Sequence, residues 1–126
     1  MKIEFLDSGS PDCPLIRLYA FDSTEAVRLR EILRALSDGA CESFDLHNDP
    51  SVEAVDGCQL TLQLRQTDSG IIRRGRSTFN CVFTAGTWRS IAALVEPFCE
   101  SATPGYYQWL TEEGDALLLL SPDGGW

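Results

Sequence analysis

The sequence has no long hydrophobic run. Its longest uninterrupted apolar stretch, residues 116–120, is about a quarter of the ~20 residues that a membrane-spanning helix needs. Residues 1–7 carry acidic side chains where an export signal would have its apolar stretch, so we expect no signal peptide. These absences exclude insertion into a membrane and predict a soluble, cytoplasmic protein.

Catalytic and metal-binding signatures are also missing. The chain contains no Gly-x-Ser-x-Gly and no glycine-rich phosphate loop. Its one histidine, His47, lies between Asp45 and Asp49, but alternate residues of one strand supply at most a partial metal shell, and the spacing matches no zinc or calcium loop. We therefore predict no catalytic residue, no metal and no cofactor, and we interpret His47 as part of a solvated strand end.

The five cysteines do not form a disulfide pattern. They are odd in number and widely spaced, in a chain large enough to fold without bridges, which predicts free thiols in a reducing compartment. Cys58 and Cys81 lie on apolar strand faces, and Cys99 ends an apolar helical stripe. Cys13 and Cys41 have acidic neighbours, which raise a thiol pKa. We expect all five to behave as small hydrophobic side chains rather than as nucleophiles.

Composition indicates one globular unit with an acidic surface. The 126 residues are 44% apolar and 23% charged, which is ordinary for a folded protein and predicts a single domain over residues 1–126. The net charge is −9, distributed as −7 over residues 1–60, +4 over residues 61–90 and −6 over residues 91–126. Such a chain repels polyanions at long range, so we expect neither nucleic acid nor anionic membranes as partners.

Two helices are predicted. Asp22 and Glu25 form a capping box at the start of a helix over residues 23–37, and Gly39 provides a left-handed C-terminal cap. A second helix over residues 86–99 would be capped by Thr84 or Thr87 and would bend or end at Pro97, because proline cannot continue a regular helix.

The remaining periodic segments alternate with period two, as strands do. We expect strands at residues 3–6, 15–21, 41–47, 58–66, 77–84, 106–110 and 116–120. The order (β)βαβββαββ predicts a two-layer α+β fold, in which an antiparallel or mixed sheet of about five to seven strands carries both helices on one face. The unbroken apolar strand 116–120 should be covered on both faces.

Three surface features are candidate binding sites. Arg73, Arg74 and Arg76 could contact an anion, pair with neighbouring carboxylates or meet an acidic partner chain. The aromatic residues of the strand 106–110 are typical of protein interfaces, and the acidic segment 38–56, which lacks lysine and arginine, could steer a cationic protein. The residues that we assign to protein interaction are Asp45, Asp49, Glu53, Tyr106, Tyr107 and Trp109.

The sequence favours a non-catalytic protein-binding module with a cationic protein partner, and it leaves the oligomeric state open. In type it is similar to bacterial immunity and accessory proteins, a similarity of class that rests on no motif. The alternative is an enzyme or small-ligand-binding protein with a site on the exposed sheet face. A deep pocket lined by Arg17, Arg65 or His47 with converging carboxylates would favour that alternative.

Overall fold

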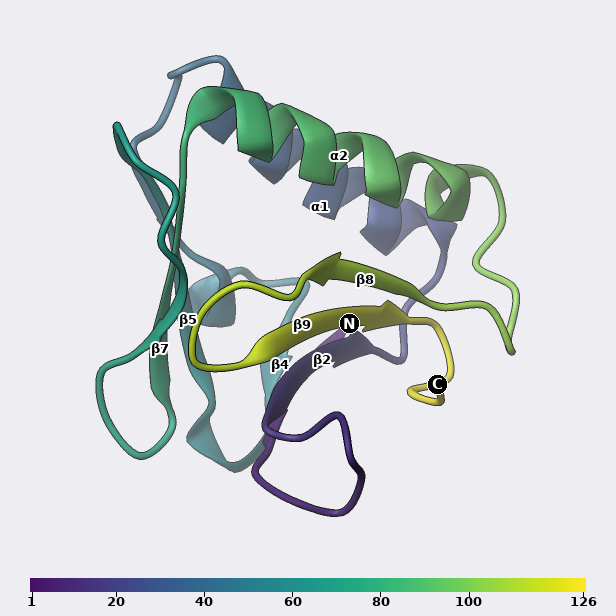
Figure 1. Cartoon of the computed structure of the whole chain (residues 1–126). Helices are drawn as coiled ribbons and strands as arrows, with labels where there is room; N and C mark the ends of the chain where they lie inside the picture. Colours follow the sequence, from purple (N-terminus) through teal and green to yellow (C-terminus); the bar gives the residue numbers. More distant parts are fainter.

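The chain folds into two helices and two mixed sheets, an α+β architecture that confirms the predicted class (Figure 1). The computed structural model describes residues 1–126. The helices are α1 (Ser23–Ser37) and α2 (Ala85–Glu100). The strands are β1 (Lys2–Leu6), β2 (Leu15–Tyr19), β3 (Ser43–Asp45), β4 (Glu53–Ala54), β5 (Gln59–Leu64), β6 (Gly70–Arg73), β7 (Thr78–Phe83), β8 (Gln108–Thr111) and β9 (Leu117–Ser121).

The strands form two sheets rather than the predicted single one. The order β4-β1-β2-β9-β8 makes the larger sheet, here called sheet A, and β3-β5-β7-β6 makes sheet B. Alternation along a strand fixes which side chains face the core, but it does not specify the neighbouring strand. In the structure β2 pairs with β9 in parallel, β5 pairs with β7 in parallel, and no ladder joins β2 to β5.

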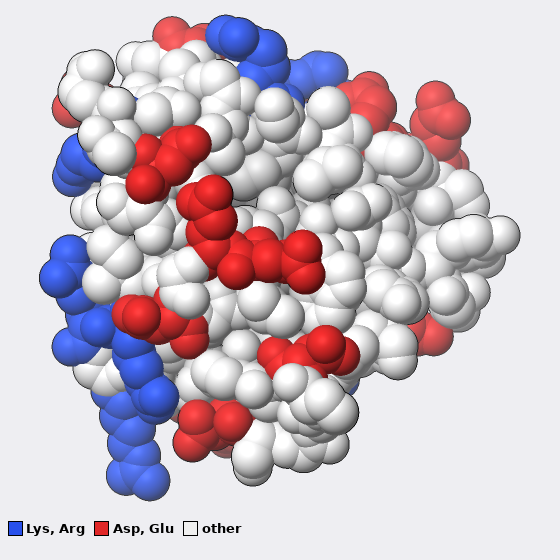
Figure 2. Space-filling view, viewed as in Figure 1, with Lys and Arg blue, Asp and Glu red and all other residues white.

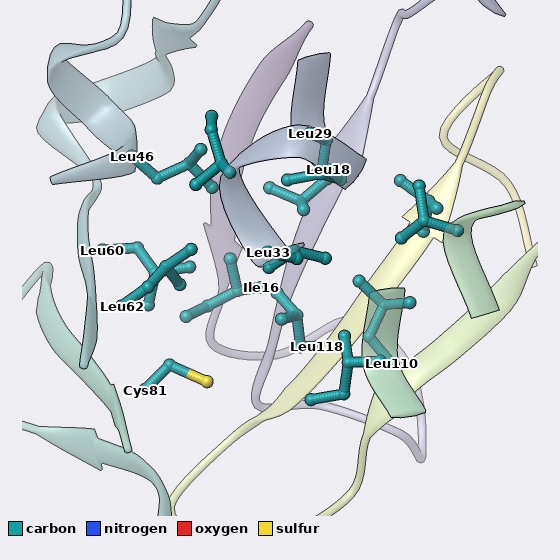
Figure 3. Close-up of a cluster of buried hydrophobic side chains, with 14 of the residues drawn as sticks. Ile16, Leu18, Leu29, Leu33, Leu46, Leu60, Leu62, Cys81, Leu110 and Leu118 are labelled. Atoms are coloured by element: carbon teal, nitrogen blue, oxygen red, sulfur yellow. The ribbon is translucent and has the colours of Figure 1, made fainter. Parts of the chain in front are cut away.

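Both helices lie above sheet A, and sheet B stands at an angle to sheet A at the left of the view, with its upper end beside the helices (Figure 1). A cluster of 27 buried residues fills the space between. Leu29 and Leu33 of α1 point into it, together with Ile16 and Leu18 of sheet A and Leu60 of sheet B (Figure 3). The predicted cover on both faces of the last strand is confirmed, because Leu118, Leu119 and Leu120 are all buried.

The local signals at the helix ends are confirmed. The Asp22 carboxylate accepts a hydrogen bond from the Glu25 amide at 2.9 Å, and the Glu25 side chain accepts one from the Asp22 amide at 3.3 Å. Thr84 caps α2. The helix continues through Pro97 to Glu100, so the alternative that it ends at the proline is wrong.

Two short strands, β4 and β6, were not predicted. Gly70 and the arginines after residue 72 made the β6 segment resemble a loop, but Ile71 is fully buried and β6 pairs antiparallel with β7. Conversely, the strand expected at residues 41–47 covers only β3, after which Leu46–Asn48 form a short 3₁₀ turn.

The two sheets are joined at Ile71. Its amide donates to the Glu113 carbonyl at 3.0 Å, and the Asp115 amide donates to the Ile71 carbonyl at 2.6 Å. This brings the loop between β8 and β9 against the open edge of β6, with Gly114 directly opposite Ile71. A Cβ built on Gly114 would lie within 2.8 Å of the Ile71 carbonyl carbon, so only glycine fits the junction as it stands.

Candidate functional site

The aromatic residues near the end of the chain divide into buried and exposed members. Trp88 is fully buried and donates its indole N–H to the Gln63 carbonyl at 3.0 Å. Tyr106 and Tyr107 are 68% and 47% exposed. Alternation along the predicted strand 106–110 would have exposed only one of these two tyrosines, but β8 begins at Gln108. Both tyrosines therefore lie in the preceding loop, where the alternation does not apply.

A groove of about 390 Å³ lies between the C-terminal end of α2 and the loop that carries the two tyrosines. We call it the tyrosine groove; its lining residues are Pro97, Phe98, Ser101, Thr103, Tyr106, Tyr107 and Gln108. Phe98 is buried and its ring packs at 6.0 Å from that of Phe21. The groove therefore combines an anchored aromatic side chain with two exposed phenol rings and several polar groups.

The sequence predicted the tyrosines but not the rest of this groove. Phe98 belongs to the apolar stripe of α2, and that stripe explains its burial without any binding role. The sequence feature that could have pointed to the groove is Pro97, an exposed apolar residue on the same helix turn as Phe98. The turn at residues 103–106, closed by a hydrogen bond from the Tyr106 amide to the Thr103 carbonyl at 3.4 Å, carries the tyrosines to the helix end.

Acidic residues lie next to the groove residues in the chain or bond to the loop that carries the tyrosines. Residues 90–126 contain six acidic residues and no lysine or arginine. Glu100 is exposed next to the lining residue Ser101 and forms no ion pair. Asp123 accepts a hydrogen bond from the Gly105 amide at 3.1 Å. The pKa of Asp123 is lowered, mainly by a hydrogen bond from the Gly125 amide. A negative charge therefore persists beside the loop that carries Tyr106 and Tyr107.

Trp109, the third aromatic residue assigned to protein interaction, is half-buried on β8. Its ring is 6.3 Å from that of Tyr107 in an edge-to-face arrangement. Trp109 therefore packs against Tyr107, and its environment depends on the position of that ring.

The acidic segment 38–56 is partly neutralised by residues from elsewhere in the chain. Asp49 is buried, and its carboxylate accepts a hydrogen bond from Arg28 of α1 at 2.8 Å, which lowers its pKa. Glu53 lies 3.8 Å from the Lys2 amine. Asp45 is exposed and accepts a hydrogen bond from the Thr61 hydroxyl at 2.8 Å. Asp49 is thus committed to an internal contact and is not available to a partner, which a local count of charges could not reveal.

The arginines of the β6–β7 turn have different environments. Arg73 stacks over Phe5 at 4.7 Å and donates to the carbonyls of Gly75 and Arg76, so it holds the turn and covers the core. Arg74 and Arg76, with Arg65 and Arg89, are the four basic residues that join no ion pair. In the view of Figure 2, Lys and Arg side chains lie along the left edge and at the top, and Asp and Glu side chains spread across the centre, the top and the right.

The cysteines and the histidine, which are the residue types most often used in catalysis, have structural roles here. All five cysteines are free, as expected. Burial raises the pKa of Cys58 to about 11 and raises that of Cys81, so both thiols are held in the protonated form. His47 accepts a hydrogen bond from the Leu60 amide at 3.0 Å and thereby ties the 3₁₀ turn to β5. No three His, Cys, Asp or Glu side chains gather in a group that could hold a metal ion.

A second hollow, of about 370 Å³, lies at the end of β5 beside the start of α2. Arg65 and Glu42 are its charged residues, and it contains no cysteine or histidine. Arg17, the other arginine considered for a pocket, pairs with Glu4 at 2.6 Å and stacks on Tyr19. Glu42 is the only carboxylate in the lining of this hollow. Asp68 lies next to the hollow, but its carboxylate accepts hydrogen bonds from the amide of the lining residue Thr84 at 2.8 Å and from the Thr87 hydroxyl at 2.7 Å.

No helix has the length and apolar character to cross a bilayer. No family model matches the chain, and the searches of curated proteins and of solved structures return no match.

Proposed function

We propose that the protein is a non-catalytic binding module whose partner is a protein with a basic surface. The observation that carries the proposal is the tyrosine groove, where two exposed phenol rings lie in a stretch of chain without a single basic residue. Tyrosine is enriched among the residues that dominate protein interfaces, because it buries a large area and keeps a polar group. Two such exposed side chains at one groove are therefore typical of a contact surface.

Charge supports a cationic partner. The chain has a net charge of −9, and Asp and Glu side chains spread across the middle of the face shown in Figure 2. An acidic surface accelerates encounter with a basic protein mainly at low salt, because charges separated by more than about 10 Å are screened at 0.1 M. Asp45 and Glu53 contribute to this field from exposed positions.

The test is partner capture with matched variants. The double substitution Tyr106→Ala and Tyr107→Ala should abolish capture, since loss of an interface hot spot costs about 2 kcal/mol or more for each side chain. Arg74→Gln with Arg76→Gln serves as the control, because neither residue lines the groove, and it should leave capture unchanged. Asp45→Lys with Glu53→Lys should slow association at low salt. A partner that binds all these variants equally would refute the proposal.

The alternative of an enzyme or small-ligand protein has less support. The hollow beside Arg65 is the place it would require, but Glu42 is the only carboxylate that lines it. Asp68 beside it is held by hydrogen bonds from Thr84 and Thr87 at the start of α2, whereas acid–base chemistry uses a pair of groups with separated pKa values. A small molecule that raises the melting temperature of the wild type but not of Arg65→Ala would favour this alternative.

A further inference from the structure

We propose that the tyrosine groove binds the side chain of an arginine from the basic partner, with its guanidinium on the rings of Tyr106 and Tyr107 and within reach of Glu100. This inference rests on the proposed function and names the group that the groove recognises. It depends on the shape of the groove, on its charge and on the way this chain pairs its own arginines.

The shape of the groove suits an amphipathic side chain. Pro97 and Phe98 provide apolar surface, while Ser101, Thr103 and Gln108 provide polar groups. A volume of about 390 Å³ is near the lower limit of ~300–1,000 Å³ for ligand sites. A long side chain with an apolar stem and a polar end fits such a place, because the stem can lie on the apolar surface while the charged end stays hydrated.

The charge of the groove selects a cation. Glu100 is exposed without an ion pair, and the pKa of Asp123 is lowered, so that Asp123 is ionised beside the loop. The faces of the phenol rings carry negative partial charge and attract cations within about 6 Å. An anionic or neutral occupant would gain neither interaction.

Arginine is favoured over lysine by the chain's own pairs. Arg17 lies 4.1 Å from the centre of the Tyr19 ring, and Arg73 lies 4.7 Å from that of Phe5. Tyr106 and Tyr107 are more exposed than any other large hydrophobic side chain and have no cation over their rings. A planar guanidinium stacks on a ring and reaches a carboxylate at the same time, which the compact ammonium of lysine does less well.

The test is an NMR titration of the full chain with three synthetic peptides, acetyl-(Gly-Arg)₃-amide and its lysine and citrulline counterparts. Citrulline keeps the shape of arginine but not its charge. The chain has three indole N–H groups; the signal of Trp109, beside Tyr107, should move, and that of buried Trp88 should not. The citrulline peptide should bind about tenfold more weakly, as expected for loss of a cation–π contact and an exposed ion pair, and the lysine peptide should bind more weakly than the arginine peptide.

Variants locate the effect. Tyr106→Leu with Tyr107→Leu should abolish the shifts, and Glu100→Gln should reduce affinity a few fold. Glu31→Gln removes the same charge from the exposed side of α1 and should change nothing. Equal binding of the arginine peptide and either counterpart, or shifts unaffected by the tyrosine variants, would overturn the inference. If partner capture still required the tyrosines, the proposed function would survive that result; peptide binding without a tyrosine-dependent partner would instead refute the proposed function.

Discussion

Comparing Gly114→Ala with Gly105→Ala separates two requirements at the junction between the sheets: a positive φ, and the absence of a side chain next to Ile71. Gly114 has φ = +95°, and a Cβ there would overlap the backbone of Ile71. Gly105 has φ = +94°, but nothing lies within 4 Å of its added Cβ. Gly105→Ala therefore measures the backbone conformation alone, and Gly114→Ala measures conformation and overlap together.

The expected loss in the free energy of unfolding is several fold larger for Gly114→Ala than for Gly105→Ala. A left-handed conformation should cost an alanine about 1–2 kcal/mol at either site. At Gly114 the overlap adds about 1–3 kcal/mol, and the two hydrogen bonds at Ile71 would each lose about 1 kcal/mol as the loop moves away from β6. Gly114→Ala should therefore destabilise the protein by at least ~2 kcal/mol more than Gly105→Ala.

Urea unfolding followed by tryptophan fluorescence, to which the buried Trp88 contributes, measures this difference. With a slope near 1.5 kcal/mol per molar urea, within the usual range for small proteins, the midpoint of Gly114→Ala should fall about 1 M or more below that of Gly105→Ala. Gly39→Ala, another open left-handed position with φ = +73°, should behave like Gly105→Ala. Equal losses for all three variants would show that the sheets do not depend on the contact at Ile71.

Three further outcomes are expected. Asp49→Asn should lower the free energy of unfolding by about 1–3 kcal/mol at pH 7, whereas Glu53→Gln should change it by less than ~1 kcal/mol. Because the pKa of Asp49 is lowered by folding, its stabilisation is present above its unfolded pKa, and the difference between wild type and Asp49→Asn should shrink as the pH falls through the folded value. Mass spectrometry after alkylation without reductant should find five free thiols in unfolded protein, with Cys58 and Cys81 unlabelled while the protein is folded; a disulfide would contradict the structure. His47→Ala should cost about 1 kcal/mol through the lost bond to Leu60, and wild-type protein should retain no equivalent of zinc or calcium after dialysis.

Local signals in the sequence were sufficient for the helices. The bounds of α1 follow from Asp22, Glu25 and an apolar stripe, all of which act within four residues of one another. The strands were found by their alternation, as in β5, where Leu60 and Leu62 are buried and Gln59 is exposed. The class of the fold depends only on such elements and their order, which is why it could be predicted.

Long-range pairing explains what the sequence did not predict. The separation into two sheets depends on the pairing of β2 with β9. The burial of Asp49 depends on its hydrogen bond from Arg28 in α1. For the same reason, the candidate site was predicted only in part. Tyr106 and Tyr107 stand out as residue types, whereas the groove beside them exists only because the loop returns to the end of α2.

The pairing of β2 with β9 has a consequence for the order in which the protein folds. Sheet B and α2 come from one contiguous stretch, residues 43–100, and β5 meets β7 across a connection of 13 residues. The central pair of sheet A instead closes a loop of about a hundred residues, which costs about 1.8 kcal/mol more in chain entropy than the shorter connection. We expect sheet B and the helices to assemble early, and sheet A to close in the late, slow step that sets the folding rate.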